Sequence, residues 1–153
     1  MDDALVVLDT DERRRELLTE AAQLAGGADA RLHVLSLLTH EAFEEKRDSL
    51  DAVAEEEHTS YDDSAIMDDA HQEAAAVVEE VVGDYDVEWD VLAGRIGQAE
   101  TEADRILEAA ADNDIDHVFL TGNQRSPTGK AVFGDRAQAV IINFDGPVTS
   151  LLG

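Results

Sequence analysis

The residues best suited to binding a ligand lie in one stretch, residues 117–134, which contains no Asp or Glu. The chain has 36 acidic residues among 153, so an even distribution would place roughly four of them in this stretch. It carries the cations Arg125 and Lys130, with Arg136 just beyond it. The stretch is also rich in glycine and hydroxyl side chains, namely Gly122, Ser126, Thr128, Gly129 and Gly134.

This composition favours an anion site, because backbone N–H groups, local positive charge and a following helix N-terminus all attract negative charge. The alternative is a tight turn in which the glycines only satisfy the backbone and the cations pair with nearby acids. The segment Gly129-Lys130-Ala131 is not a Walker A loop, because its spacing and its final residue both differ from that motif.

A second group of charged residues, Asp9, Asp11 and Glu12, follows the first predicted strand. Such carboxylates bind hard cations in some proteins. Asp9 with Glu12 three residues later also has the spacing of a capping box at a helix start. For Asp11 and Glu12 we favour solvated acids of a helix start. The histidines show no metal-ligand spacing and cysteine is absent, so we expect no metal site.

The formal net charge of −25 is the most extreme property of the chain, and lysine is almost absent. Self-repulsion of this size destabilises a compact state unless salt screens it. We therefore interpret the composition as that of a protein from a salt-accumulating halophile. The same charge argues against nucleic-acid binding. No apolar stretch is long enough for a membrane span and no secretory signal is evident, so we expect a cytoplasmic protein with one domain over residues 1–153.

Strands and helices are predicted to alternate along the chain. Apolar or alternating segments predict strands at 4–8, 32–38, 87–91, 116–121 and 148–152. Helical spacing predicts a first helix that ends at residues 26–27, followed by helices at 41–57, 61–82, 98–111 and 135–143, with a break near residues 58–60. Such alternation indicates an α/β fold with a doubly wound parallel sheet and helices on both faces. Ligands bind such sheets beside the carboxyl ends of strands at the switch point.

Four segments make the chain resemble the universal stress protein family over nearly its whole length: LVVLD at 5–9, HV at 33–34, VFLTG at 118–122 and GPV at 146–148. The resemblance implies a five-stranded parallel sheet in the order 3-2-1-4-5, a dimeric assembly and, as in many members, ATP binding. It also implies that Asp9 contacts the nucleoside and that Val34 lines the adenine pocket.

The family's nucleotide motif, G-x2-G-x9-G-[ST], is present here in degenerate form. By this match, Gly122 is the first glycine and Gly134 the third, but Arg125 stands in place of the second and the span is one residue short. Asp135 replaces the Ser or Thr that would meet a phosphate, and its carboxylate would repel one. Arg125 and Lys130 could compensate for that repulsion, because both cations bind phosphate oxygens.

These observations predict a non-catalytic regulatory protein that binds ATP with Mg²⁺, or another phosphate-bearing ligand, at residues 121–135. The alternative is a dimeric interaction protein of the same fold that has lost its nucleotide. No nucleophile with a neighbouring base indicates an enzyme. The short uncharged strand at 148–152 is expected at a sheet edge, where it favours a homodimer. Arg95 is expected either to reach the ligand or Asp9, or to form a surface ion pair, and His33 and His117 are expected to be satisfied sheet residues.

Overall fold

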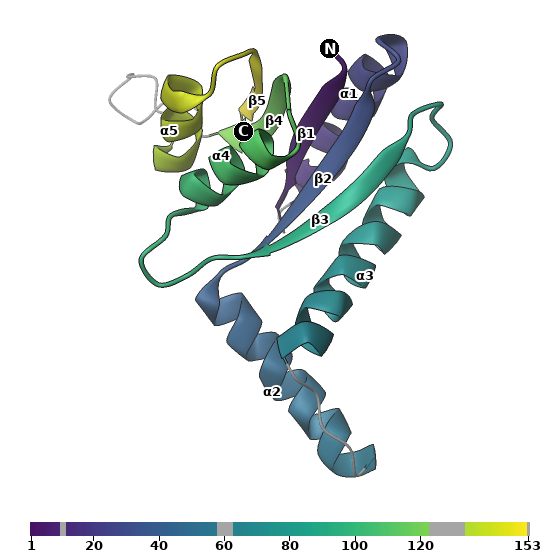
Figure 1. Ribbon diagram of the computed structural model, residues 1–153. Helices are drawn as coiled ribbons and strands as arrows, with labels where there is room; N and C mark the ends of the chain where they lie inside the picture. The colour runs from purple at the N-terminus through teal and green to yellow at the C-terminus, as the bar shows by residue number, and fades with distance from the viewer. Residues whose placement is uncertain (10–11, 58–62, 123–133, 153) are drawn as a thin grey trace.

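The computed structural model describes residues 1–9, 12–57, 63–122 and 134–152 (Figure 1). Within these ranges strands and helices alternate along most of the chain. The strands are β1 (Asp3–Leu8), β2 (Arg31–Leu38), β3 (Trp89–Arg95), β4 (His117–Gly122) and β5 (Val148–Leu152). The helices are α1 (Arg13–Gly27), α2 (His40–Glu57), α3 (Asp63–Val82), α4 (Glu102–Asp112) and α5 (Asp135–Asn143).

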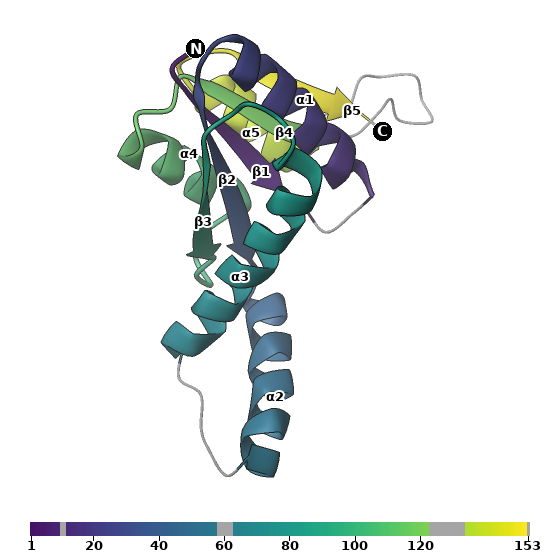
Figure 2. The ribbon, with the colours of Figure 1, turned by 90° about the vertical axis from the view of Figure 1, so that its right-hand side faces the viewer.

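The five strands form one sheet in the order β3-β2-β1-β4-β5, and all neighbouring pairs are parallel. The predicted fold class is therefore confirmed. Helices α1 and α3 cover one face of the sheet, and α4 and α5 cover the other (Figure 2). Each face has its own apolar core, because successive side chains of the buried strands point to opposite sides. Val6 belongs to the core under α1 and α3, and its neighbours Leu5 and Val7 belong to the core under α4 and α5.

The sheet opens at the switch point, where β4 leaves its neighbour β1. The ladder between β1 and β2 continues to the pair Leu8 and Ser36, whereas the ladder between β1 and β4 ends at Val6 and Phe119. Beyond that pair, β4 stays hydrogen-bonded to β5 as far as Gly122. The carboxyl ends of β1 and β4 are therefore free to hold side chains between them, which is the place where open α/β sheets bind ligands.

Helix α2 extends beyond the carboxyl ends of β2 and β3, away from the main body of the molecule (Figures 1 and 2). Its base is held by a small apolar cluster in which Phe43 packs with Leu38 of β2 and with Ile66 and Ala70 of α3. The Arg95 guanidinium lies over the Phe43 ring, with its carbon 3.8 Å from the ring centroid. This contact is a cation–π interaction, which adds to the apolar packing at the root of α2.

Two predicted elements, the third strand and the fourth helix, differ from the structure by more than two residues at one end, and the other predicted boundaries agree within two residues. Strand β3 begins at Trp89 and continues to Arg95, later than the predicted 87–91, because it pairs with β2 from Leu32 to Leu38. Helix α4 begins four residues later than predicted. Thr101 caps it, with its hydroxyl accepting from the Asp104 N–H and the Asp104 carboxylate accepting from the Thr101 N–H.

Helix α5 and strand β5 have the predicted bounds, and the predicted break near residues 58–60 lies outside the described residues. None of the helices in the described ranges has the length and apolar character that crossing a membrane requires.

Candidate functional site

The candidate site is centred on Asp9, which directly follows β1 at the switch point. Its carboxylate forms a bidentate ion pair with Arg136 in the first turn of α5, with Nη1–Oδ1 at 2.7 Å and Nη2–Oδ2 at 2.9 Å. The hydroxyl of Thr121, in β4, donates to Asp9 Oδ2 at 2.6 Å. Three segments distant in the sequence thus meet at one carboxylate.

A second acid also contacts the guanidinium. Glu102, at the start of α4, accepts from Arg136 Nη1 at 3.2 Å. We call Asp9, Glu102, Thr121 and Arg136 the carboxyl-end cluster. The side chains of Arg136 and Asp9 are only 20% and 19% exposed. Nearby, Arg13 Nη1 donates to the carbonyl oxygen of Gly122 at 2.7 Å, which ties the start of α1 to the end of β4.

The electrostatics of the cluster keep both members of the ion pair charged. Burial by itself raises the pKa of Asp9, but the hydrogen bonds and charge of Arg136, with help from Thr121 and Arg13, outweigh burial and lower it. The pKa of Arg136 is raised, chiefly by its hydrogen bonds to Asp9 and against the effect of burial. The pair is thus a fixed, partly shielded dipole at the end of the sheet.

The structure decides against a cap role for Asp9. The residue at the N-cap of α1 is Glu12, which has helical backbone angles and makes no side-chain cap hydrogen bond. Asp9 instead directs its carboxylate to α5 and β4. Asp11 lies outside the described residues. Among the residues that the structure describes, no three His, Asp or Glu side chains are grouped as metal ligands.

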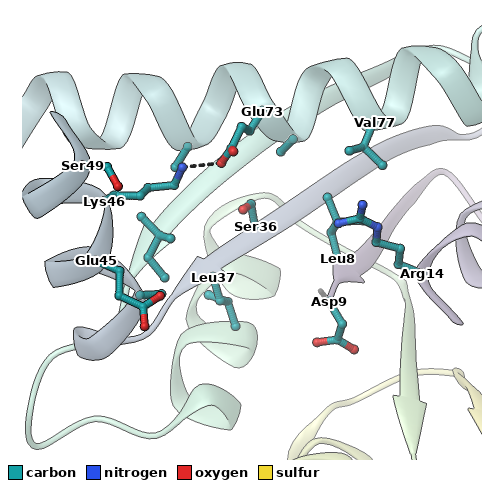
Figure 3. Close-up of a pocket in the computed structure, with 14 residues that line it drawn as sticks. Leu8, Asp9, Arg14, Ser36, Leu37, Glu45, Lys46, Ser49, Glu73 and Val77 are labelled. Atoms are coloured by element: carbon teal, nitrogen blue, oxygen red, sulfur yellow. Dashed lines mark hydrogen bonds and ion pairs between the residues drawn. The ribbon is translucent and has the colours of Figure 1, made fainter. Parts of the chain in front are cut away.

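A cavity of about 490 Å³ lies beside Asp9, between the ends of β1 and β2 and the helices α1, α2 and α3 (Figure 3). Its polar lining includes Asp9, Arg14, Ser36, Lys46 and Glu73. Figure 3 shows that Asp9 and Arg14 lie at the β1 end of the cavity and that Lys46 lies at the opposite end, between α2 and α3. Each end of the cavity therefore contains a cation and a carboxylate: Arg14 and Asp9 at one end, and Lys46 and Glu73 at the other.

Lys46, at the far end of the cavity, is neutralised by carboxylates, whereas no carboxylate partner of Arg14 is found in the described part of the chain. Lys46 donates to Asp69 at 2.8 Å and to Glu73. Burial alone would lower the pKa of Lys46, but these two carboxylates raise it. Arg14 has no carboxylate partner within the described ranges, although the chain has a large excess of acids. Arg14 therefore remains available for an anionic group in the cavity.

The predicted site residues fall into three groups. Asp9 and Gly122 lie at the switch point, and Gly134, with φ of 85°, leads into α5, whose first residue, Asp135, is exposed. Val34 is fully buried in the core under α1 and α3 and is not among the cavity-lining residues. The remaining predicted residues, Arg125, Ser126, Gly129 and Lys130, lie outside the described residues.

Arg95 is directed to α2 and α3 rather than to Asp9. It pairs with Asp63 at 3.6 Å and stacks on Phe43, so the surface ion pair is the arrangement observed. The two strand histidines are satisfied as expected. His33 contacts carboxylates on both sides, and His117 Nε2 lies 2.8 Å from the hydroxyl of Thr149.

Sequence reasoning did not identify Glu102, Arg14 or Lys46 as site residues; it placed Thr121 at the start of the candidate stretch and Arg136 just beyond it, without a role for either. One signal was present in the sequence: three consecutive arginines, residues 13–15, directly follow the acidic segment after β1 in a chain that is poor in cations. The sequence singled out Arg136 only as a cation beside the acid-free stretch, because its partner Asp9 is 127 residues away and is met only through the strand order.

Comparisons with known proteins agree with this architecture. The model of the Universal stress protein family matches residues 1–150. A universal stress protein from Archaeoglobus fulgidus is similar, with a TM-score of 0.65, 20% identity and coverage of 98% of each chain.

Two further similar structures contain nucleotides. One is a universal stress protein from Archaeoglobus fulgidus in complex with dAMP, with a TM-score of 0.60, 16% identity and coverage of 98% of this chain and 97% of that chain. The other is a universal stress protein in complex with cAMP, with a TM-score of 0.56, 13% identity and coverage of 99% and 96%. No curated protein sequence gives a significant match.

Proposed function

The chain belongs to the universal stress protein family, and from this premise we propose that it is a regulatory protein that binds ATP or another phosphate-bearing ligand without catalysing a reaction. The relatives in complex with dAMP and cAMP support a nucleotide as the ligand class. We expect Mg²⁺ to accompany ATP, as it commonly does when triphosphates bind.

The observation that carries this proposal is the position of Asp9. Its carboxylate lies at the switch point of the sheet, on the edge of a cavity of about 490 Å³. Cavities that hold small ligands measure roughly 300–1,000 Å³ and combine an apolar lining with a few polar groups. A carboxylate in this place accepts hydrogen bonds from the hydroxyl groups of a ribose or the amino group of a base.

Two further features support an anionic ligand. Arg14 lines the same cavity, and no described carboxylate neutralises it. The N-terminus of α5 lies on the other side of Asp9, and the partial positive charge of a helix N-terminus attracts phosphate. Residues Arg125, Ser126, Gly129 and Lys130 remain predicted phosphate contacts of the segment between Gly122 and Gly134.

The second candidate function is an interaction protein of the same fold that has lost its nucleotide. The specific observation in its favour is that Asp9, the carboxylate expected to meet the nucleoside, is already paired with Arg136. Asp135 at the start of α5 adds a negative charge where a phosphate would approach.

Calorimetric titration with ATP, with and without Mg²⁺ and in molar potassium chloride, separates the two candidates. We expect saturable binding by the wild type and binding at least about tenfold weaker for D9N, since one charged hydrogen-bond acceptor is worth roughly 1.5–3 kcal/mol. The matched control is D112N, which removes an exposed carboxylate from the end of α4 and should bind as the wild type does. No binding by the wild type would leave the interaction protein as the better candidate.

We also propose that two copies pair through β5. This strand lies at the edge of the sheet, carries no charged side chain, and has only partly buried or exposed residues. Unpaired edge strands of this kind favour association with another strand. Light scattering in molar salt should give the mass of a dimer, and T149K, which adds a charge within β5, should shift the mass towards the monomer.

A further inference from the structure

We propose that Arg136 is an internal counter-ion of the site, so that a ligand hydrogen-bonds to both carboxylate oxygens of Asp9 only by displacing the guanidinium. This inference rests on the proposed function, because it concerns access to the same carboxylate. It makes Arg136 a residue that sets the affinity and the class of the ligand.

The hydrogen-bond geometry shows that three of the roughly four acceptor positions of the carboxylate are occupied. Asp9 Oδ1 accepts from Arg136 Nη1, and Oδ2 accepts from both Arg136 Nη2 and the Thr121 hydroxyl. A bidentate guanidinium covers the edge of a carboxylate that a ligand's N–H or O–H groups would otherwise approach. A ligand donor must therefore compete with a charged donor that is already in place.

The same geometry shows how the site opens. Arg136 Nη1 already touches Glu102 at 3.2 Å, and Nη2 lies 3.1 Å from Thr121 Oγ1. A guanidinium displaced from Asp9 therefore keeps a carboxylate partner. Its charge is not left uncompensated, which is the situation that makes breaking a shielded ion pair costly. Glu102 thus provides an alternative position for the displaced side chain.

This arrangement favours one chemical class of ligand. A molecule that carries both hydrogen-bond donors and an anionic group can satisfy Asp9 and meet the displaced Arg136 at the same time. A nucleotide has both features, whereas a nucleoside has only the donors. The ion pair therefore favours nucleotides over nucleosides.

The decisive probe is adenosine, because it has no phosphate that Arg136 could contact. We expect R136Q to bind adenosine roughly tenfold more tightly than the wild type, because Asp9 is then open in most molecules rather than in a minor fraction. R136K should fall between the two proteins, since an ammonium group cannot form the bidentate pair. The matched control is R105Q, which removes an arginine that pairs with Glu100 and Glu108 and has no contact with Asp9.

The outcomes distinguish this inference from the proposed function. Tighter adenosine binding by R136Q, with R105Q unchanged, supports the inference. Equal or weaker adenosine binding by both folded Arg136 variants, while the wild type binds ATP, overturns the inference and leaves the proposed function intact. Failure of the wild type and of R136Q to bind either molecule contradicts the proposed function and the inference with it. Far-ultraviolet circular dichroism verifies that each variant is folded. If R136Q does not fold, R136K takes its place as the test variant.

Discussion

The two ends of the sheet each hold a cluster of hydrogen-bonded side chains that includes carboxylates, but the clusters are built differently. At the amino end, His33 of β2 lies between Asp90 of β3, at 2.8 Å from Nδ1, and Asp3 of β1, at 3.0 Å from Nε2. We call these three residues the amino-end cluster. All its members come from adjacent strands, and none of them lines the cavity.

The carboxyl-end cluster instead joins elements that are not neighbours in the sheet. Asp9 follows β1, Thr121 belongs to β4, and Glu102 and Arg136 come from α4 and α5. It borders the cavity on one side. Hydrogen-bonded side chains on paired strands hold the sheet together, whereas we propose that the same chemistry, at the point where strands separate, is exchanged for a ligand.

Removing salt should have the largest effect, because it acts on the whole charged surface. Between about 1 M and 0.01 M salt the Debye length grows from about 3 Å to about 30 Å. With a formal net charge of −25, we expect the free energy of unfolding to fall by several kcal/mol, on the order of half the stability of an ordinary domain. Urea unfolding at each potassium chloride concentration measures the change.

A double-mutant cycle in the carboxyl-end cluster separates the effect of salt on one shielded ion pair from its effect on the whole charged surface. The coupling energy between Asp9 and Arg136, from a double-mutant cycle with D9N and R136Q, should change much less with salt than the total stability, because shielded pairs are screened less. A stability that does not depend on salt would show that the acidic composition is not a halophilic adaptation.

Removing the Asp9 carboxylate from the carboxyl-end cluster should have the next largest effect on the free energy of unfolding. D9N leaves the Arg136 side chain, which is 20% exposed, with Glu102 as its one charged partner among the described residues. We expect a loss of about 2 kcal/mol, between the values for exposed and for fully buried pairs. Urea unfolding in molar salt measures it, and D112N, at an exposed position, should be neutral or slightly stabilising.

Breaking the amino-end cluster should cost less and should leave binding unchanged. The imidazole ring of His33 contacts a carboxylate through each of its nitrogens, and a glutamine amide cannot reach both carboxylates in its place. We expect H33Q to lose about 1 kcal/mol of stability, because Asp3 and Asp90 are each about one-third exposed and become hydrated. The exposed H40Q is the control for stability. A change in ATP affinity in H33Q would contradict the separation of the two clusters.

The smallest expected effect is on the acid limb of the stability curve. The folded protein lowers the pKa of Asp9, so this carboxylate contributes its full stabilisation above the usual pKa of aspartate, about 4. The contribution is lost as the pH falls through the lowered value in the folded protein. Below pH 4, the stability of D9N should therefore fall less steeply with decreasing pH than that of the wild type. Equal slopes for the two proteins would mean that the ion pair does not hold the proton off Asp9.

Local patterns in the sequence were enough to predict most of the fold. The apolar run at residues 4–8 and the turn before Val148 each mark a strand, and they do so without reference to the rest of the chain. The start of α4 was missed because Thr101 and Asp104 form a capping box in which Asp takes the place of the usual Glu. The extent of β3 was missed because it depends on the length of its neighbour β2.

The candidate site was predicted only in part, because its contacts are not local. Asp9 was assigned to the site through the family resemblance. Arg136 was noted only as a cation beside the acid-free stretch, since nothing in its own neighbourhood indicates that the strand order will place it opposite Asp9. The cavity also depends on the packing of α2 and α3 over β2. Hydrophobic periodicity predicts each of these elements separately but does not predict how they pack together.

The central position of β1 has a consequence for synthesis on the ribosome. Asp9 emerges early, but the residues that complete its surroundings, at positions 102, 121 and 136, are translated much later. Until α5 has been translated this carboxylate must stay hydrated, because only a chain that includes Arg136 can close around it. Formation of the Asp9–Arg136 pair therefore reports that α5 has docked.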